Sequence, residues 1–396
     1  MNSNARLPLG PEQPFRLIVT GGGTGGHTYP ALTAVRTLQA RLAGTGRAVD
    51  VLWVGTADGL EARVAPAEGI RFVSVATGKV RRSSNPLKLV SPANVKDMGR
   101  VPLGAAQARS IIAEFRPDAV LATGGYVAVP VGFAARLCHR PLVVHEQTVR
   151  LGAANRTLAR VATRFAVSSE STLALLPESA RRTAVVTGNP VRPEVMVGRA
   201  DKAVEALALD GFDRRLPTVY VTGGALGSPQ INRLVCGILP WLLERANVVH
   251  QCGPDNVEEL DAATAALPAE LAARYRSLGY VGAELPDVLA LADVVIARSG
   301  AGTVAELTAL GKASVLVPLA TSAGDEQAHS ARQLADSGAA VALSGEVSPQ
   351  DLRDAVGELV ADDARRLDMA KQARAQGRSD AAERLVDVVL ATAAGR

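Results

Sequence analysis

The sequence predicts an α/β protein made of two doubly wound, Rossmann-like domains. Short apolar runs alternate with helix-like segments along most of the chain, which is typical of parallel sheets wrapped by helices. The opening unit at residues 15–41, a strand ending in glycines and then a helix, is echoed from Tyr220 onward. The 396 residues, 47% of them hydrophobic, suffice to bury two cores. Ligands of such sheets lie outside the carboxyl ends of the strands, so we expect the domains to face each other across a binding cleft.

The first domain begins with a buried strand that ends in a glycine-rich turn. Gly21, Gly23 and Gly26 satisfy the pattern G-x-G-x-x-G, and His27 follows directly. We expect Thr28 to cap the next helix, whose apolar face carries Leu32, Val35, Leu38 and Leu42. Glycines let the backbone approach a ligand, and a helix N-terminus attracts anions. The turn therefore predicts a phosphate cradle with an imidazole on its rim.

A dinucleotide site at this turn is disfavoured by two details, the first of which is that a titratable His27 directly follows the last glycine. After the second strand the acid is Asp58, displaced past Gly55, whereas a ribose-binding carboxylate would end the strand. No Lys-Ser or Lys-Thr pair follows the glycines, so the turn is not a Walker loop.

Apolar runs mark the other strands, at 49–55, 71–77, 118–125, 141–147, 164–169, 184–190, 218–224, 247–253, 273–282, 292–302 and 312–319. Ser228 and Pro229 are placed to cap and start the helix after the second glycine turn. We expect a tail at 1–13, a first domain at 14–190 and a second at 191–365. We expect the C-terminal helices at 366–396 to be able to pack back on the first domain.

Composition excludes several classes of protein. The net charge of +4 is too small to imply a nucleic-acid partner. The three cysteines lack C-x-x-C spacing, which indicates reduced thiols in a cytosolic protein. No signal peptide or membrane-spanning segment is visible. No His/Cys cluster or D-x-D motif is present, so we expect no metal and no cofactor.

Residues 79–100 form a basic segment. It carries six Lys or Arg residues against one acid, Asp97, with apolar residues interleaved. Such a segment suits an anionic membrane surface, at about 1 kcal/mol per basic residue. A solvated loop is the alternative.

Polar residues at strand ends are candidates for chemistry. A third glycine turn, Arg298 to Gly302, opens a helix in which Glu306 would either bind two ribose hydroxyls or close a capping box with Thr303. The His-Glu-Gln triplet at 145–147 ends another strand, where packed polar anchors are also common. Gln327 could touch a sugar hydroxyl or act as a solvated cap.

Taken together, these motifs resemble one enzyme family. GGGTGGHTYPAL, HEQ, GNPVR, the second glycine loop, RSGAGTVAE and DEQ occur in this order over about residues 15–375. The chain is similar to the MurG-type N-acetylglucosaminyltransferases of peptidoglycan assembly, which have the GT-B fold. The resemblance implies transfer of N-acetylglucosamine from UDP-N-acetylglucosamine to the C4 hydroxyl of the muramoyl sugar of lipid I, forming lipid II. It also implies inversion, no bound metal, and a peripheral position on the cytoplasmic membrane face.

The resemblance also implies roles for individual residues. His27 would be the base or positioning group for the attacking hydroxyl, and Gln327 would contact the hydroxyls of N-acetylglucosamine. Arg192 and the backbone at Gly282 would hold the nucleotide. Residues near the two sugars would be Thr24, Gly25, Gly26, Glu146 and Thr148. Diphosphate and ribose would lie on the third turn and its helix, at Ala301, Gly302, Thr303, Val304, Ala305 and Glu306.

The chain departs from the family pattern at three positions. Thr148 stands where the family commonly has an Asn that contacts the donor sugar. Ala225 stands where a Ser would offer a hydroxyl to the diphosphate, with Ser228 nearby. Glu326 stands where a neutral or basic residue is usual.

Three other functions stay open on the sequence. The chain could be a related GT-B enzyme with another UDP-sugar or lipid acceptor, or a non-catalytic envelope binding protein. A dinucleotide oxidoreductase is the third, disfavoured by the duplicated glycine unit.

Overall fold

The chain is described by a computed structural model that covers residues 13–78, 92–320 and 325–395, without the side chains of 92–101. The basic segment expected to bind a membrane lies outside the described residues over 79–91, and only its helical backbone is described over 92–100. Among the helices of the described ranges, none combines the length and the apolar character needed to span a membrane.

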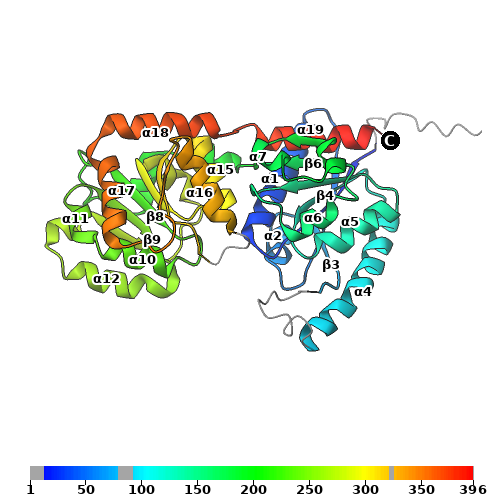
Figure 1. Cartoon of the computed structure of the whole chain (residues 1–396), viewed down its shortest axis with the longest axis horizontal. Coiled ribbons are helices and arrows are strands. Elements are labelled where there is room, and N and C mark those ends of the chain that lie inside the picture. The colour runs from blue at the N-terminus through cyan, green and yellow to red at the C-terminus, as the bar shows by residue number, and fades with distance from the viewer. Residues whose placement is uncertain (1–12, 79–91, 321–324, 396) are drawn as a thin grey trace, which may run out of the picture. The chain divides into compact units, whose positions relative to one another are not determined.

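The chain forms two compact units, each built on one parallel sheet (Figure 1). The first unit consists of Met1–Pro190 and Asp380–Arg396, and the second of Val191–Ser379. The predicted fold class, two doubly wound α/β domains, is confirmed. The C-terminal helices are divided between the units, because α18 (Asp363–Gln376) lies in the second and α19 (Ala381–Ala394) in the first.

The first unit contains a seven-stranded sheet in the order β3-β2-β1-β4-β5-β6-β7. Its strands are β1 (Phe15–Gly21), β2 (Val49–Gly55), β3 (Arg71–Ser74), β4 (Ala119–Gly124), β5 (Leu142–Glu146), β6 (Arg164–Val167) and β7 (Ala184–Val186). Besides α19, its helices are α1 (Gly25–Ala43), α2 (Glu61–Ala67), α4 (Pro92–Phe115), α5 (Ala128–Leu137), α6 (Ala153–Leu158), α7 (Glu170–Leu173) and α8 (Glu178–Arg181). The strand order reverses between β1 and β4, which is where ligands of such sheets bind.

The second unit contains a six-stranded sheet in the order β10-β9-β8-β11-β12-β13. Its strands are β8 (Thr218–Thr222), β9 (Asn247–Gln251), β10 (Tyr275–Leu278), β11 (Val294–Ala297), β12 (Ala313–Leu316) and β13 (Val341–Ala342). Besides α18, its helices are η1 (Pro193–Val197), α9 (Ala200–Ala206), α10 (Pro229–Cys236), α11 (Leu239–Leu243), η2 (Pro254–Asn256), α12 (Val257–Ala265), α13 (Ala269–Ala272), α14 (Leu285–Leu291), α15 (Ala301–Leu310), α16 (Glu326–Asp336) and α17 (Pro349–Ala361). Here the order reverses between β8 and β11.

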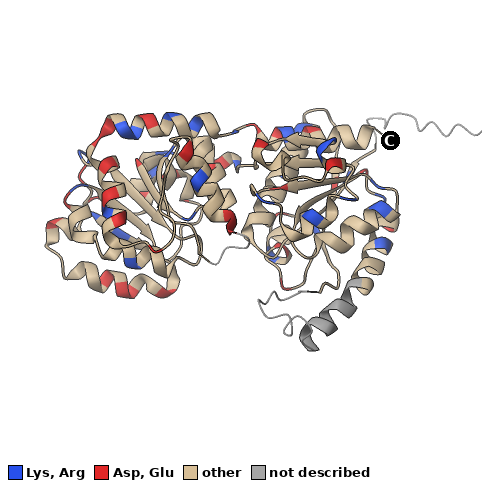
Figure 2. Ribbon diagram, in the orientation of Figure 1, with Lys and Arg blue, Asp and Glu red and all other residues tan. Residues whose placement is uncertain are grey.

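Both faces of each sheet are covered by apolar side chains. In β1, Leu17 and Val19 enter one core cluster and Ile18 enters the other, because successive strand residues point to opposite faces. The cluster around Leu17 also contains Leu385 of α19, so the last helix completes a core begun by the first strand. Charged residues gather on the outer helices, whereas most strand positions carry neither sign (Figure 2).

Helix starts differ in part from the predictions. The expectation that Thr28 caps the first helix is wrong, because α1 begins four residues earlier with Thr24 at the N-cap, and the Thr28 hydroxyl donates to the Thr24 carbonyl at 3.0 Å. The capping-box alternative for Glu306 is also wrong, because Gly300 is the N-cap of α15 and Thr303 lies inside the helix. The prediction for Ser228 is confirmed, since its Oγ accepts from the N–H of Ile231.

Truncation of Leu385 tests whether α19 is part of the first core. We expect Leu385→Ala to lower the free energy of unfolding of the first unit by about 2–5 kcal/mol, because the side chain is fully buried. In a Trp241→Phe background, Trp53 is the remaining one of two tryptophans, and its fluorescence during urea unfolding reports on the first unit. Glu383→Ala, on the exposed face of α19, is the control and should change stability by no more than about 0.5 kcal/mol. Equal losses in both variants would contradict the packing of α19.

Candidate active site

The glycine turn after β1 is packed tightly onto two side chains of its own unit. A Cβ atom at Gly21 would lie 1.9 Å from the Thr123 hydroxyl, and one at Gly22 would lie 2.1 Å from the Glu61 carboxyl carbon. Gly23 has φ +82°, which side chains rarely adopt. Glycine is therefore required here by space and by backbone conformation.

The Glu61 side chain fixes the conformation of this glycine turn through hydrogen bonds. It is fully buried, and its carboxylate accepts from the Gly23 N–H at 2.8 Å and from the Thr56 N–H and hydroxyl, both at 2.9 Å. The Gly23 N–H, which we expected to bind phosphate, therefore donates to the Glu61 carboxylate instead of facing a ligand. The first turn of α1, with Gly25 and Gly26, still offers backbone N–H groups to a ligand.

His27 is half-buried in the first turn of α1. Its Nδ1 lies 3.1 Å from Oε1 of Gln147, and its carbonyl accepts from the Thr123 hydroxyl at 3.0 Å. A Cβ atom at Gly124 would come within 2.9 Å of the His27 ring, so only glycine at the end of β4 lets the ring lie there. Thr24 and Gly26 are exposed beside it.

His145 at the end of β5 is fully buried, and Gln147 is nearly so. The His145 Nε2 lies 2.9 Å from the Gly188 carbonyl, and Nε2 of Gln147 lies 3.0 Å from both His145 Nδ1 and the His145 carbonyl. Burial is the main cause that lowers the pKa of His145 to about 4, so its imidazole is neutral at pH 7. Gln147 therefore connects a buried neutral histidine to His27.

Glu146 shapes the loop that follows β5. Its buried carboxylate accepts from the Thr148 N–H and hydroxyl at 3.1 and 2.8 Å, from the Gly152 N–H at 2.9 Å, and from Asn155 Nδ2 at 3.0 Å. Both oxygens are thus engaged within the loop. The Thr148 hydroxyl, which replaces the amide common in the family, is likewise turned toward Glu146.

The second glycine turn, after β8, has a different support. A Cβ atom at Gly227 would lie 1.8 Å from the Cys252 carbonyl, so backbone packs directly on backbone. Ser228 is buried and its hydroxyl oxygen accepts from the Ile231 N–H at the start of α10, which leaves the hydroxyl hydrogen to donate. Ala225 and Leu226 are both exposed on this turn, Leu226 at 83%.

The third glycine turn leads from β11 into α15 and is open. Among the described residues, which leave out 321–324, no heavy atom lies within 4 Å of a Cβ atom placed at Gly300 or Gly302. The N-terminus of this ten-residue helix therefore presents accessible backbone with partial positive charge, as an anion site requires.

Glu306 lies one turn into α15 and is paired with Arg192. The guanidinium donates to Oε1 from Nη2 at 2.7 Å and from Nε at 3.2 Å, while the Glu306 side chain is 18% exposed. Both of these hydrogen bonds go to Oε1, so the ion pair orients the carboxylate through one of its two oxygens. This places two predicted site residues together in the second unit.

Two further predicted residues take part in internal contacts. The Gln327 carbonyl accepts from the Ser299 hydroxyl at 2.7 Å and its Oε1 accepts from the Leu319 N–H at 2.9 Å, so Gln327 lies beside the third turn. The Gly282 N–H donates to Oε2 of Glu284 at 3.1 Å.

The sequence analysis missed several residues of this region. It weighed Asp58 as the acid after β2, whereas the acid that contacts the glycine turn is Glu61, three residues later at the start of α2. It also missed Asn155, whose Nδ2 bridges the His145 carbonyl and Glu146, and whose buried Oδ1 has no hydrogen-bond partner among the described residues. A lone asparagine in a short helix gives no sequence signal.

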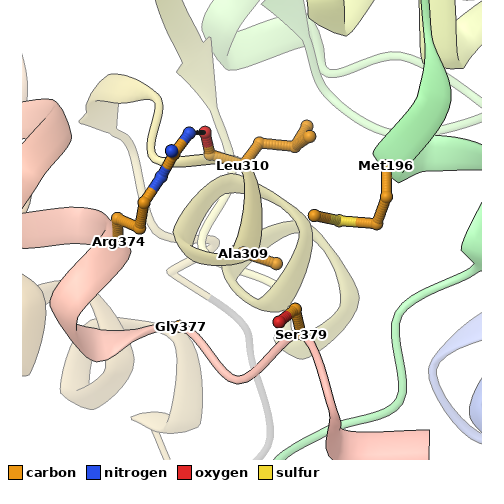
Figure 3. A pocket seen from close by; sticks show the side chains of 6 residues that line it. All are labelled: Met196, Ala309, Leu310, Arg374, Gly377 and Ser379. Carbon is orange, nitrogen blue, oxygen red and sulfur yellow. Dashed lines mark hydrogen bonds between the residues drawn. The ribbon is translucent and has the colours of Figure 1, made fainter.

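A hollow of about 410 Å³ lies elsewhere in the second unit (Figure 3). It is lined by Met196, Ala309, Leu310, Arg374, Gly377 and Ser379, and Arg374 donates to the Leu310 carbonyl across it at 2.7 Å. It lies at the C-terminal end of α15, about 15 Å along the helix from the open turn. It is therefore not part of the site built by the glycine turns.

Comparison with known protein families first shows the class of enzyme to which the chain belongs. Models of the glycosyltransferase family 28 N-terminal domain and C-terminal domain match residues 17–167 and 218–385. The first range lies within the first unit, and the second covers most of the second unit and ends inside α19 of the first. The chain is a glycosyltransferase.

Individual relatives narrow the family. The chain is 34% identical over 386 residues to the UDP-N-acetylglucosamine–N-acetylmuramyl-(pentapeptide) pyrophosphoryl-undecaprenol N-acetylglucosamine transferase of Geobacter metallireducens, covering 95% of this chain and 98% of that protein. It is 35% identical over 378 residues to the protein of the same name from Exiguobacterium sibiricum, with the same coverage. The crystal structure of Acinetobacter baumannii MurG matches with a TM-score of 0.71 and 29% identity over 96% of this chain and 100% of that one. The chain belongs to this MurG-type transferase family, as its motifs predicted.

The buried histidine makes the first unit sensitive to acid. Unfolded His145 binds a proton below its ordinary pKa of 6.5, whereas folded His145 does so only near 4, so the unfolded state binds more protons between these values. The free energy of unfolding contributed by this group is therefore lost as the pH falls, by about 1.4 kcal/mol per pH unit.

We expect His145→Gln to remove this contribution. The measurement is urea unfolding between pH 6.5 and 5, followed by Trp53 fluorescence in the Trp241→Phe background. The control is His139→Asn, an exposed histidine at φ +53° where asparagine is tolerated. An unchanged pH slope in His145→Gln would show that His145 is not held neutral by folding.

Proposed function

We propose that the chain transfers N-acetylglucosamine from UDP-N-acetylglucosamine to the C4 hydroxyl of the muramoyl sugar of lipid I, the undecaprenyl-diphosphate-linked muramoyl-pentapeptide. The product is lipid II, formed with inversion at the anomeric carbon. Near full-length relatives with this named activity support the donor and acceptor. The observation that carries the proposal is the open N-terminus of α15 with the Arg192–Glu306 pair beside it, because this arrangement suits a nucleoside diphosphate.

The second unit binds the donor in this proposal. The first turn of α15, from Ala301 to Ala305, takes the diphosphate on its backbone N–H groups, which stabilise the negative charge that develops on departing UDP. Glu306 accepts hydrogen bonds from the ribose hydroxyls through Oε2, while Arg192 holds Oε1. Gln327 contacts the N-acetylglucosamine hydroxyls, with its amide oriented by the Leu319 N–H.

The first unit supplies the base. The C4 hydroxyl gives its proton to His27 as its oxygen forms a bond to the anomeric carbon, on the face opposite the departing phosphate. The bond between the anomeric carbon and the phosphate oxygen breaks, and UDP leaves with the electron pair. A histidine base is suited to this step near pH 7.

The lipid-linked acceptor sets where the enzyme acts. We infer a peripheral association with the cytoplasmic membrane face, with the basic residues of 79–100 contacting anionic lipid.

Replacement of His27 tests the base. We expect His27→Asn to lower kcat by roughly 10²–10⁴-fold, because a positioned base is lost. UDP affinity should be unchanged, since the contacts proposed for UDP come from the second unit. The assay is product analysis with labelled UDP-N-acetylglucosamine and a lipid I analogue, with UDP-glucose and UDP-galactose as competing donors. His139→Asn is the control. Full activity of His27→Asn would contradict the proposal that His27 is the base.

Replacement of Glu306 tests the nucleotide site. We expect Glu306→Gln to weaken UDP binding about 10- to 100-fold, because hydrogen bonds to a charged acceptor contribute roughly 1.5–3 kcal/mol. Binding is measured by calorimetry, and Glu258→Gln, an exposed residue of α12, is the matched control. UDP affinity equal to that of the control would contradict the ribose contact.

A further inference from the structure

Two backbone carbonyls fix the protons around His27. The Gly188 carbonyl can only accept, so His145 carries its proton on Nε2, 2.9 Å away. His145 is neutral, and its Nδ1 therefore lacks a proton and accepts from Gln147.

The second carbonyl fixes the amide of Gln147 independently. The atom of Gln147 that lies 3.0 Å from the His145 carbonyl must be a donor, because two oxygens would repel each other there. Both contacts therefore place Nε2 toward His145, and Oε1 faces His27 at 3.1 Å. Gln147 is 4% exposed, so water does not readily replace these partners.

The proton on His27 follows from this orientation. Oε1 of Gln147 is only an acceptor, so Nδ1 of neutral His27 must carry the proton. The remaining nitrogen, Nε2, then holds the lone pair, and within the described part of the chain it has no hydrogen-bond partner.

We propose that Gln147 and His145 are positioning residues that hold neutral His27 in the tautomer protonated on Nδ1, so that Nε2 takes the proton of the attacking hydroxyl. The tautomer follows from the hydrogen bonds alone, while the role of Nε2 rests on the proposed function. In the reaction the O–H bond of the attacking hydroxyl breaks as the Nε2–H bond of His27 forms. His27 becomes an imidazolium whose Nδ1–H still donates to Oε1 of Gln147.

The direct test is nitrogen-15 NMR of the histidine rings in the full-length protein without substrate. We expect the Nδ1–H pattern for His27 and the opposite, Nε2–H pattern for His145. Among the five histidines, the signals of His27 and His145 are identified by their disappearance in His27→Asn and His145→Gln. A wild-type His27 protonated on Nε2 would overturn the proposal, and this result requires no variant of Gln147 to fold.

Gln147→Met tests the link to turnover, because methionine offers no comparable acceptor at this position. We expect His27 to lose its single tautomer and kcat to fall at least tenfold, within the roughly 10²–10⁴-fold that a positioned base supplies. KM for UDP-N-acetylglucosamine should stay within about twofold, since the Glu306 contacts are untouched. Gln350→Met, an exposed glutamine of α17, is the matched control. An unchanged His27 tautomer in Gln147→Met would refute the positioning role.

The same experiments separate this proposal from the proposed function. If the wild-type protein shows the Nδ1–H tautomer but transfers no N-acetylglucosamine to a lipid I analogue, the positioning pair stands and the proposed function fails. If transfer occurs while His27 is protonated on Nε2, the proposed function stands and the positioning pair fails.

Discussion

Two buried carboxylates hold the loops on which the chemistry of the first unit depends. Glu61 fastens the glycine turn after β1, and Glu146 fastens the loop after β5. Burial of a carboxylate is costly unless several donors surround it, and each of these accepts from at least three. Because His27 follows the first loop and Gln147 begins the second, both carboxylates help to position the two residues for their 3.1 Å contact.

The glycine turn that follows the first strand of each unit packs on different polar groups in the two units. In the first unit a carboxylate lies beneath the glycine turn and takes one of its N–H groups. In the second unit the corresponding turn packs on the Cys252 carbonyl, and the open helix N-terminus is that of α15, which follows the neighbouring strand β11. The sequence echo thus predicts the strand–turn–helix geometry in both places, but the residues beneath the turn decide which ligand it favours.

This difference explains how much could be predicted. Strand positions follow from apolar runs, and the helix face of α1 from its spacing, because both are encoded by neighbours in the chain. Glu61 was missed because its role depends on Gly23, 38 residues away, and Asp58 was the nearer candidate. The helix start at Thr24 was missed because glycines are poor helix formers, whereas Gly25 and Gly26 form the first turn of α1. The two-residue strand β13 is too short to show a pattern.

The choice of glutamine between two histidines has a physical reason. A carboxylate at position 147 would accept from His27 equally well, but its second oxygen would face the His145 carbonyl and an unprotonated Nδ1, with no donor between them. Reversing His145 to supply that donor would break its bond to the Gly188 carbonyl. An amide alone donates to one histidine, accepts from the other and adds no charge to a buried site. The proton positions around His27 are therefore set by the carbonyls of Gly188 and His145, both of which can only accept.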